Sequence, residues 1–187
     1  STGPDDCLQT HTRRQMFDNV IRPSLKLINA IEDPDAVRGR GGDCFSLAPS
    51  VQRINEGQEP IILRAPEEAV QKVRNYLGDL KPVVITLRET TYWPHRNSNN
   101  EEWIKFAEYL EQKGEQVIFL RDTKYAHEPI GKFAIYPEAS KDLMIRKALY
   151  EQAKMNMFVG NGPWVLTLFS KSPWMMFAKP DEKDQCF

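Results

Sequence analysis

The sequence predicts an α/β fold in which a Rossmann-like parallel sheet is flanked by helices and preceded by an N-terminal helical appendage. Two observations predict it. From residue 61 onward, short apolar runs that suit buried strands alternate with segments of helical apolar spacing, as is typical of parallel sheets. Residues 1–60, in contrast, combine one helical pattern with Pro- and Gly-rich irregular sequence. The predicted division is therefore an appendage over residues 1–60 and a Rossmann-like sheet domain over residues 61–187.

The first regular pattern covers residues 12–31, where apolar residues recur at helical spacing on both sides of Pro23. One kinked helix or two short helices are expected, because proline interrupts a helix. The pattern is lost between residues 32 and 60. Gly39-Arg40-Gly41-Gly42 superficially resembles a phosphate-binding loop, but no strand pattern precedes it and no helix pattern follows it. A plain loop is therefore expected there.

The sheet domain is expected to begin with a strand at residues 61–63. A helix then opens at Pro66, with acidic residues in its first turn, and ends at Gly78. Residues 82–87 are a nearly continuous apolar run rich in β-branched side chains, which favours a parallel strand buried on both faces. A long polar and aromatic loop, residues 88–99, follows this strand.

The next units repeat this alternation. Asn100 is expected to cap a helix that ends at Gly114, and residues 116–120 form the following strand. Residues 133–136 are a weaker strand. Ser140 is expected to cap a helix that extends to about Met155. The last strand, helix and strand are expected at residues 157–159, 164–169 and 174–177.

The turn Gly160-Asn161-Gly162-Pro163 lies between the strand at 157–159 and the helix at 164–169. Pro163 suits a first helical position, and the two glycines would let the backbone approach a ligand closely. Free N–H groups and the positive end of a helix dipole favour phosphate at such a turn. A simple strand-to-helix turn is the alternative interpretation, and the turn alone does not decide between them.

Arg88 directly follows the strand at 82–87, where its permanently charged fork could bind a diphosphate. The alternative is a surface arginine paired with Glu89 or Asp122. In a parallel sheet all strands deliver their carboxyl ends to one edge, where ligands bind. Arg88, the pair Arg121-Asp122 and Asn161 are therefore expected at the same edge.

The loop after Arg88 gathers an aromatic side chain, an imidazole and a second guanidinium in Trp93, His95 and Arg96. Binding residues concentrate on loops held by a rigid scaffold. Trp93 is either a stacking platform or a cover for the core. His95 is either a general base near neutral pH or a solvated side chain.

Net charge, cysteine spacing and the length of the apolar runs exclude several classes of protein. Net charge is −1 and the sequence pI is about 6.3, so no overall field recruits nucleic acid. Cys7, Cys44 and Cys186 lack metal-ligand spacing and are interpreted as reduced thiols, and no metal-binding Asp-x-Asp motif is present. No apolar run approaches the roughly 20 residues of a membrane span, and the start resembles no signal peptide, so a cytoplasmic location is predicted. Because the start also lacks an initiator Met, part of a longer protein is one interpretation.

Several of these features together resemble one enzyme family. Over about residues 81–177, the order and spacing of these features resemble the carboxy-terminal, donor-binding half of heptosyltransferase-like glycosyltransferases of the GT-B fold. Two departures are the Tyr92 where the family often has a basic residue, and the absence of its usual histidine from Trp164-Val165-Leu166. The family's acceptor-binding half has no counterpart in residues 1–60. The matching features are Arg88, Trp93-Pro94, Trp103 with its helix, Gly114, residues 117–120, Asp142-Leu143 with its helix, residues 158–163 and residues 173–177.

The resemblance implies a glycosyltransferase, or its donor-binding domain, that uses a nucleotide sugar as substrate without metal or other cofactor. Its partners would be the nucleotide sugar and an acceptor glycan or small molecule, with a membrane-proximal acceptor left open. A non-catalytic nucleotide-binding or assembly module and an epimerase-like enzyme acting on sugar nucleotides are the alternatives. No catalytic residue is assigned, and the predicted substrate-binding residues are Arg88, Trp93, His95, Arg96, Ser140, Asn161, Gly162 and Pro163.

Overall fold

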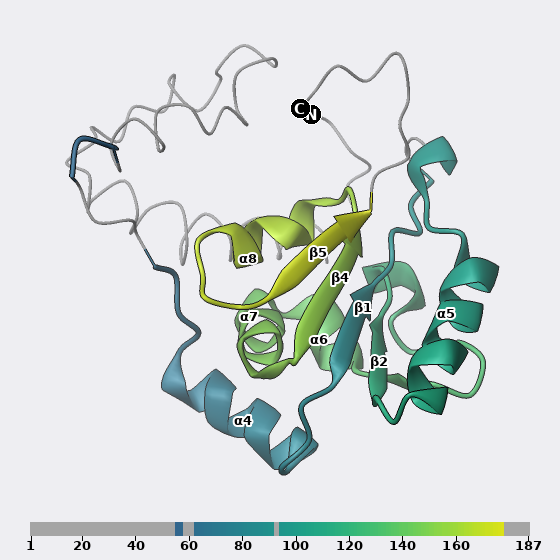
Figure 1. Ribbon diagram of the computed structural model, residues 1–187, viewed down its shortest axis with the longest axis horizontal. Coiled ribbons are helices and arrows are strands. Elements are labelled where there is room, and N and C mark those ends of the chain that lie inside the picture. Colours follow the sequence, from purple (N-terminus) through teal and green to yellow (C-terminus); the bar gives the residue numbers. More distant parts are fainter. Residues whose placement is uncertain (1–54, 58–61, 92–93, 178–187) are drawn as a thin grey trace.

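The computed structural model describes residues 55–57, 62–91 and 94–177. The helix predicted at residues 12–31 and nearly all of the predicted appendage lie outside these residues, as do Trp93 and the three cysteines. The described part contains a five-stranded sheet with helices on both faces (Figure 1). All of its strand pairs are parallel, which confirms the predicted α/β class with a Rossmann-like sheet.

The strand order is β3-β2-β1-β4-β5, so the first strand along the chain lies in the middle. Thr86 at the end of β1 is in register with Leu120 of β2 on one side and with Phe158 of β4 on the other. The carboxyl ends of these three strands therefore meet at one edge. The strands are β1 (Val83–Thr86), β2 (Val117–Leu120), β3 (Ala134–Ile135), β4 (Met155–Val159) and β5 (Trp174–Phe177).

The helices follow from the local sequence signals described above. Each residue of β1 and β2 is buried, because helices cover both faces of the central strands. The helices are α4 (Glu67–Leu77), α5 (Asn100–Gln112), α6 (Pro137–Lys141), α7 (Leu143–Gln152) and α8 (Val165–Leu168), and the 3₁₀ turns are η3 (Pro94–Arg96), η4 (Thr123–Tyr125) and η5 (Gly162–Trp164).

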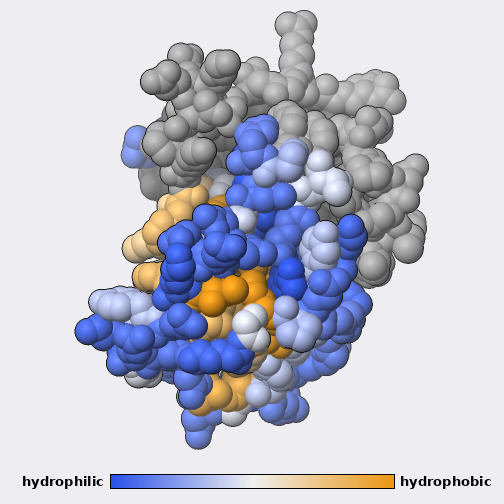
Figure 2. Space-filling model, turned by 90° about the vertical axis from the view of Figure 1, so that its right-hand side faces the viewer, coloured by the Kyte–Doolittle hydropathy of each residue, from blue (hydrophilic) through white to orange (hydrophobic). Residues whose placement is uncertain are grey.

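The sheet separates two apolar clusters. Alternate residues of a strand point to opposite faces, so Val84 faces α4, α6 and α7 while Ile85 faces α5. On the α5 side the ring of Trp103 packs edge-on against Phe177 at a centroid distance of 5.2 Å. Figure 2 shows apolar surface bordered by polar residues on this side, where Met175 and Phe177 of β5 keep 46% and 41% of their surface exposed.

The strand predicted at residues 61–63 is wrong in its described part. Ile62 and Leu63 are irregular, and the N–H of Leu63 donates to the carbonyl of Phe169, 2.6 Å away, at the end of α8. This backbone bond joins two connecting segments instead of extending the sheet. An apolar run of three residues is too short to distinguish a strand from a packed connection.

Two predicted caps are also wrong. Asn99, one residue earlier than expected, caps α5 by accepting the N–H of Glu102 at 3.4 Å. Asp142, and not Ser140, caps the long helix, because its carboxylate accepts from the N–H groups of Met144 and Ile145. The single helix predicted from 140 to about 155 is therefore divided into α6 and α7, and it ends at Gln152, so that Met155 begins β4.

Candidate functional site

The candidate site lies where the strand order reverses. The chain passes from β1 outward to β2 and β3, and then returns to place β4 on the other side of β1. In open parallel sheets, ligands bind in the crevice outside the carboxyl ends of strands at such a switch point. Arg88 follows β1 and the Gly160–Pro163 turn follows β4, so the structure brings these two predicted site segments to neighbouring strand ends.

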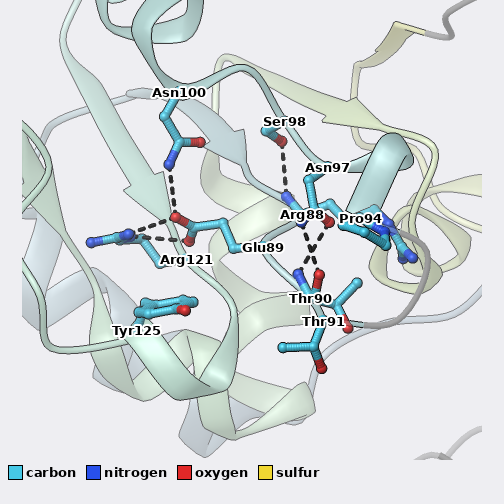
Figure 3. Close-up of a pocket in the computed structure, with 10 residues that line it drawn as sticks. All are labelled: Arg88, Glu89, Thr90, Thr91, Pro94, Asn97, Ser98, Asn100, Arg121 and Tyr125. Atoms are coloured by element: carbon cyan, nitrogen blue, oxygen red, sulfur yellow. Dashed lines mark hydrogen bonds and ion pairs between the residues drawn. The ribbon is translucent and has the colours of Figure 1, made fainter.

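The loop after β1 folds back on itself (Figure 3). The Arg88 N–H donates to Ser98 Oγ at 2.9 Å, and the Ser98 N–H donates to the Arg88 carbonyl at 2.9 Å. Further along the loop, the side-chain amide of Asn97 accepts a hydrogen bond from the Thr90 N–H and donates one to the Thr90 carbonyl. These paired bonds hold both ends of the loop together and place the 3₁₀ turn η3 at its tip.

The tip of this loop reaches the turn after β4. Arg96 Nη2 lies 3.5 Å from the carbonyl oxygen of Gly160, and both His95 and Arg96 are exposed in η3. A methyl group in place of the glycine hydrogen at Gly160 would lie 3.6 Å from the same guanidinium nitrogen, an ordinary contact. The second guanidinium predicted for the site is therefore placed over the turn.

The turn itself differs from the expected phosphate loop in one respect. The helix predicted at residues 164–169 consists of η5 and the four-residue α8. A helix this short has only a small dipole, because few peptide groups are aligned in it. Binding of an anion at this turn would therefore depend mainly on the arginines. Neither Gly160 nor Gly162 has a positive φ, and a Cβ at Gly162 would meet nothing within 4 Å.

Asn161 places a buried polar atom in the turn after β4. Its side-chain oxygen is buried and has no hydrogen-bond partner among the described residues. Its backbone is extended, and its side chain makes no capping bond to the following 3₁₀ turn. A buried acceptor without a donor is costly, and this oxygen is such an unsatisfied polar group within the described turn.

The charges around Arg88 are arranged in pairs. Burial, and then the neighbouring Arg96, lowers the pKa of Arg88, although the group remains a cation because an arginine pKa is so high. Burial also raises the pKa of Asp122, whose Oδ2 accepts the N–H of Glu89 at 2.7 Å. Glu89 in turn forms an ion pair with Arg121. Arg88 is half-buried, and the charge of Asp122, one of the two carboxylates of the alternative interpretation, acts to raise its pKa.

A polar cavity of about 470 Å³ opens beside the crevice, between the ends of β1 and β2 (Figure 3). Sequence reasoning placed Arg121 at this edge but assigned it no role, and it did not single out Asn97, Ser98 or Tyr125. The position of Arg121 directly after a buried strand was the available signal. The cavity is lined by Arg88, Glu89, Thr90, Thr91, Pro94, Asn97, Ser98, Asn100, Arg121 and Tyr125.

Ser140 makes no hydrogen bond to another predicted site residue within the described part of the chain. It is buried within α6, and its carbonyl oxygen accepts a hydrogen bond from Thr123 Oγ1 of η4 at 3.4 Å. Within the described ranges, no group of three or more His, Cys, Asp or Glu residues could hold a metal ion. The described helices also include none that is long and apolar enough to cross a membrane.

Comparisons with protein families, with curated proteins and with solved structures found no match to this chain. The functional argument therefore depends on the geometry and charge of the site itself.

Proposed function

We propose that the crevice between the carboxyl ends of β1 and β4 binds the diphosphate of a nucleotide sugar, and that the chain is the donor-binding part of a GT-B glycosyltransferase. One observation carries the binding proposal. Two guanidinium groups, Arg88 and Arg96, lie at the switch point beside the Gly160–Pro163 turn. The sugar donor and the transfer reaction come from the family resemblance.

The electrostatics of the two arginines favour a multivalent anion. Burial and the repulsion from Arg96 both oppose the cationic form of Arg88, whereas the carboxylate of Asp122 favours it. A diphosphate between them would offset that repulsion, and a planar guanidinium can bind phosphate oxygens bidentately. Partial burial strengthens such a contact because less water screens it.

The same arrangement would assist transfer as well as binding. When the sugar leaves its donor, negative charge develops on the nucleoside diphosphate, and fixed positive groups stabilise it. Arg88 and Arg96 would supply that charge in place of a metal ion. No residue is assigned as the base that activates the acceptor.

Titration calorimetry with the diphosphates and nucleotide sugars of uridine, guanosine and adenosine tests this proposal. Each titration is run first with a chelator and then with magnesium. At least one ligand should bind in the presence of the chelator, and its affinity should change little when magnesium is added. If every ligand fails to bind, or if binding requires magnesium, the proposal is wrong.

Turnover of the bound ligand separates a transferase from a non-catalytic module. Release of nucleoside diphosphate from a bound nucleotide sugar, when acceptor glycans are added, would indicate transfer. A His95→Ala variant that keeps affinity but loses turnover would indicate proton transfer by the exposed imidazole of η3. Binding without turnover is expected both of the module and of a donor-binding part tested without its acceptor-binding half, so only observed turnover decides between them.

A further inference from the structure

Arg121 is held by its own neighbours. Its Nε and Nη2 donate to the two carboxylate oxygens of Glu89, and its Nη1 donates to the carbonyls of Glu128 and Pro129 at 3.0 and 3.2 Å. The side chains of Arg121 and Glu89 keep only 10% and 8% of their surface exposed. All three guanidinium nitrogens thus have protein partners, although the residue lines the cavity at the sheet edge.

Glu89, the partner of Arg121, contacts both ends of the loop. Glu89 directly follows Arg88, and its Oε1 also accepts from Asn100 Nδ2 at 2.9 Å, at the first residue of α5. One carboxylate therefore joins the start of the loop to its end. Figure 3 shows the Glu89 side chain pointing toward Arg121 and Asn100, on the other side of the chain from Pro94.

The region joined in this way carries the proposed anion-binding residues. Arg88 is adjacent to Glu89, and Arg96 lies in η3 between Glu89 and Asn100. Without the Glu89 contacts, the loop that carries both guanidinium groups would depend on the Arg88–Ser98 and Thr90–Asn97 bonds. A carboxylate this deeply buried requires a matched cation, and the two-point geometry of the pair needs the planar fork of arginine.

We infer that Arg121 is a positioning residue: through Glu89 and Asn100 it fixes the loop that presents Arg88 and Arg96, without itself contacting the ligand. The inference rests on the proposed function, because the ligand is taken to be the anion of that site. It assigns to Arg121 a role different from that of the two arginines beside the turn.

A variant series measures this role with inorganic pyrophosphate as the probe. Arg121→Met should weaken pyrophosphate binding about tenfold, because it leaves the Glu89 carboxylate buried without a cation. Glu89→Gln alone should weaken it by a smaller factor. The double variant Glu89→Gln/Arg121→Met should bind no more weakly than Glu89→Gln, because the positioning contact is then already lost. If Arg121 contacted the anion directly, adding Arg121→Met to Glu89→Gln would weaken pyrophosphate binding by a further factor of about ten.

Hydrogen exchange separates loop positioning from a general loss of stability. In Arg121→Met, amides of residues 94–100 should exchange faster than in the parent chain, while those of α4 remain unchanged. Lys105→Met removes an exposed ion pair with Glu102 on α5 and is the matched control, with unchanged affinity and exchange. Arg121→Lys should fold but recover only part of the affinity.

Two results would overturn the inference. One is an additive loss of affinity in the double variant, and the other is unchanged exchange of residues 94–100 in Arg121→Met. A parent chain that binds no pyrophosphate removes the proposed anion site and, with it, the role of Arg121 toward that anion. In that case the exchange data still report whether Arg121 orders the loop, so the two failures are distinguishable.

Discussion

Arg96 Nη2 lies 3.5 Å from the carbonyl oxygen of Gly160, although the two residues are separated by 64 positions in the sequence. The contact exists because β1 and β4 are parallel neighbours, so that the loop after one strand meets the turn after the other. The region where they meet holds Arg88 and Arg96 of the loop and Asn161 of the turn. Its chemistry therefore depends on strand order as much as on residue type.

The first prediction concerns the anion site directly. Arg88→Ala should weaken binding of a nucleoside diphosphate by about 1.5 to 3 kcal/mol, the range for a hydrogen bond to a charged group. Folding should stay nearly intact, because Arg88 lies in a loop after β1. Calorimetry gives the affinity and thermal melting gives the stability. Arg74→Ala, an exposed arginine on α4, is the control, and full affinity in Arg88→Ala would contradict the shared site.

Part of this structure could be predicted from sequence, because local signals decided it. The β-branched run at Val83–Ile85 identified a buried strand, and the acidic first turn and Gly78 bounded α4. The pairing of β1 with β4 could not be predicted, since it depends on packing between segments far apart in the chain. The ion pair of Glu89 with Arg121 likewise joins residues 32 positions apart, and its partners have no sequence signature.

Helix caps show a different limit. Ser140 and Asp142 are both good cap residues and lie two positions apart, so propensity alone does not choose between them. The structure chooses Asp142, whose Oδ1 accepts from the Met144 N–H at 2.7 Å and from the Ile145 N–H at 3.2 Å. Ser140 is instead buried inside the short helix α6.

The second prediction follows from that cap. Asp142→Ala should lower the free energy of unfolding by about 0.5 to 2 kcal/mol, because two N–H groups at the start of α7 lose their acceptor. Ser140→Asn retains a cap-type side chain at the wrong position and should not rescue the loss when combined with Asp142→Ala. Urea unfolding followed by circular dichroism measures both. A stability equal to that of the parent chain in Asp142→Ala would show that the cap contributes nothing.

The third prediction concerns Asn156, a fully buried polar residue in β4. Its Nδ2 donates to the carbonyls of Tyr150 and Pro173 at 2.9 and 3.0 Å, and it thereby joins the end of α7 to the segment before β5. Asn156→Ala should destabilise the fold by about 1 to 3 kcal/mol, because the buried carbonyl of Tyr150 loses a donor and the partly buried carbonyl of Pro173 loses one of two. Asn75→Ala, on the exposed face of α4, should change stability by less than about 0.5 kcal/mol.

The measurement for Asn156 is again equilibrium unfolding in urea. A loss in Asn156→Ala no larger than that in Asn75→Ala would mean that the buried bonds contribute little net stability.

The last prediction is a pH dependence that arises from Tyr136. This side chain is buried, and its ring stacks on that of Tyr76 at a centroid distance of 4.1 Å. Burial, followed by the charges of Glu138 and Tyr76, raises the pKa of the Tyr136 hydroxyl from 10.0 to about 12. The folded chain thus holds this proton more tightly than the unfolded chain does, and stability should fall as pH rises from 10 toward 12.

Below pH 10 both states keep the proton, so Tyr136 contributes no pH dependence there. Tyr136→Phe retains the stacked ring and removes the titrating hydroxyl. Urea midpoints measured for both proteins between pH 9 and 12 should therefore decline less steeply in the variant, as the cited pKa requires. Lysine deprotonation and the buried Tyr150 affect both proteins equally, so the difference between the two curves reports Tyr136 together with the stacked Tyr76, whose pKa burial also raises. Parallel curves over this range would mean that ionisation of Tyr136 is not coupled to folding.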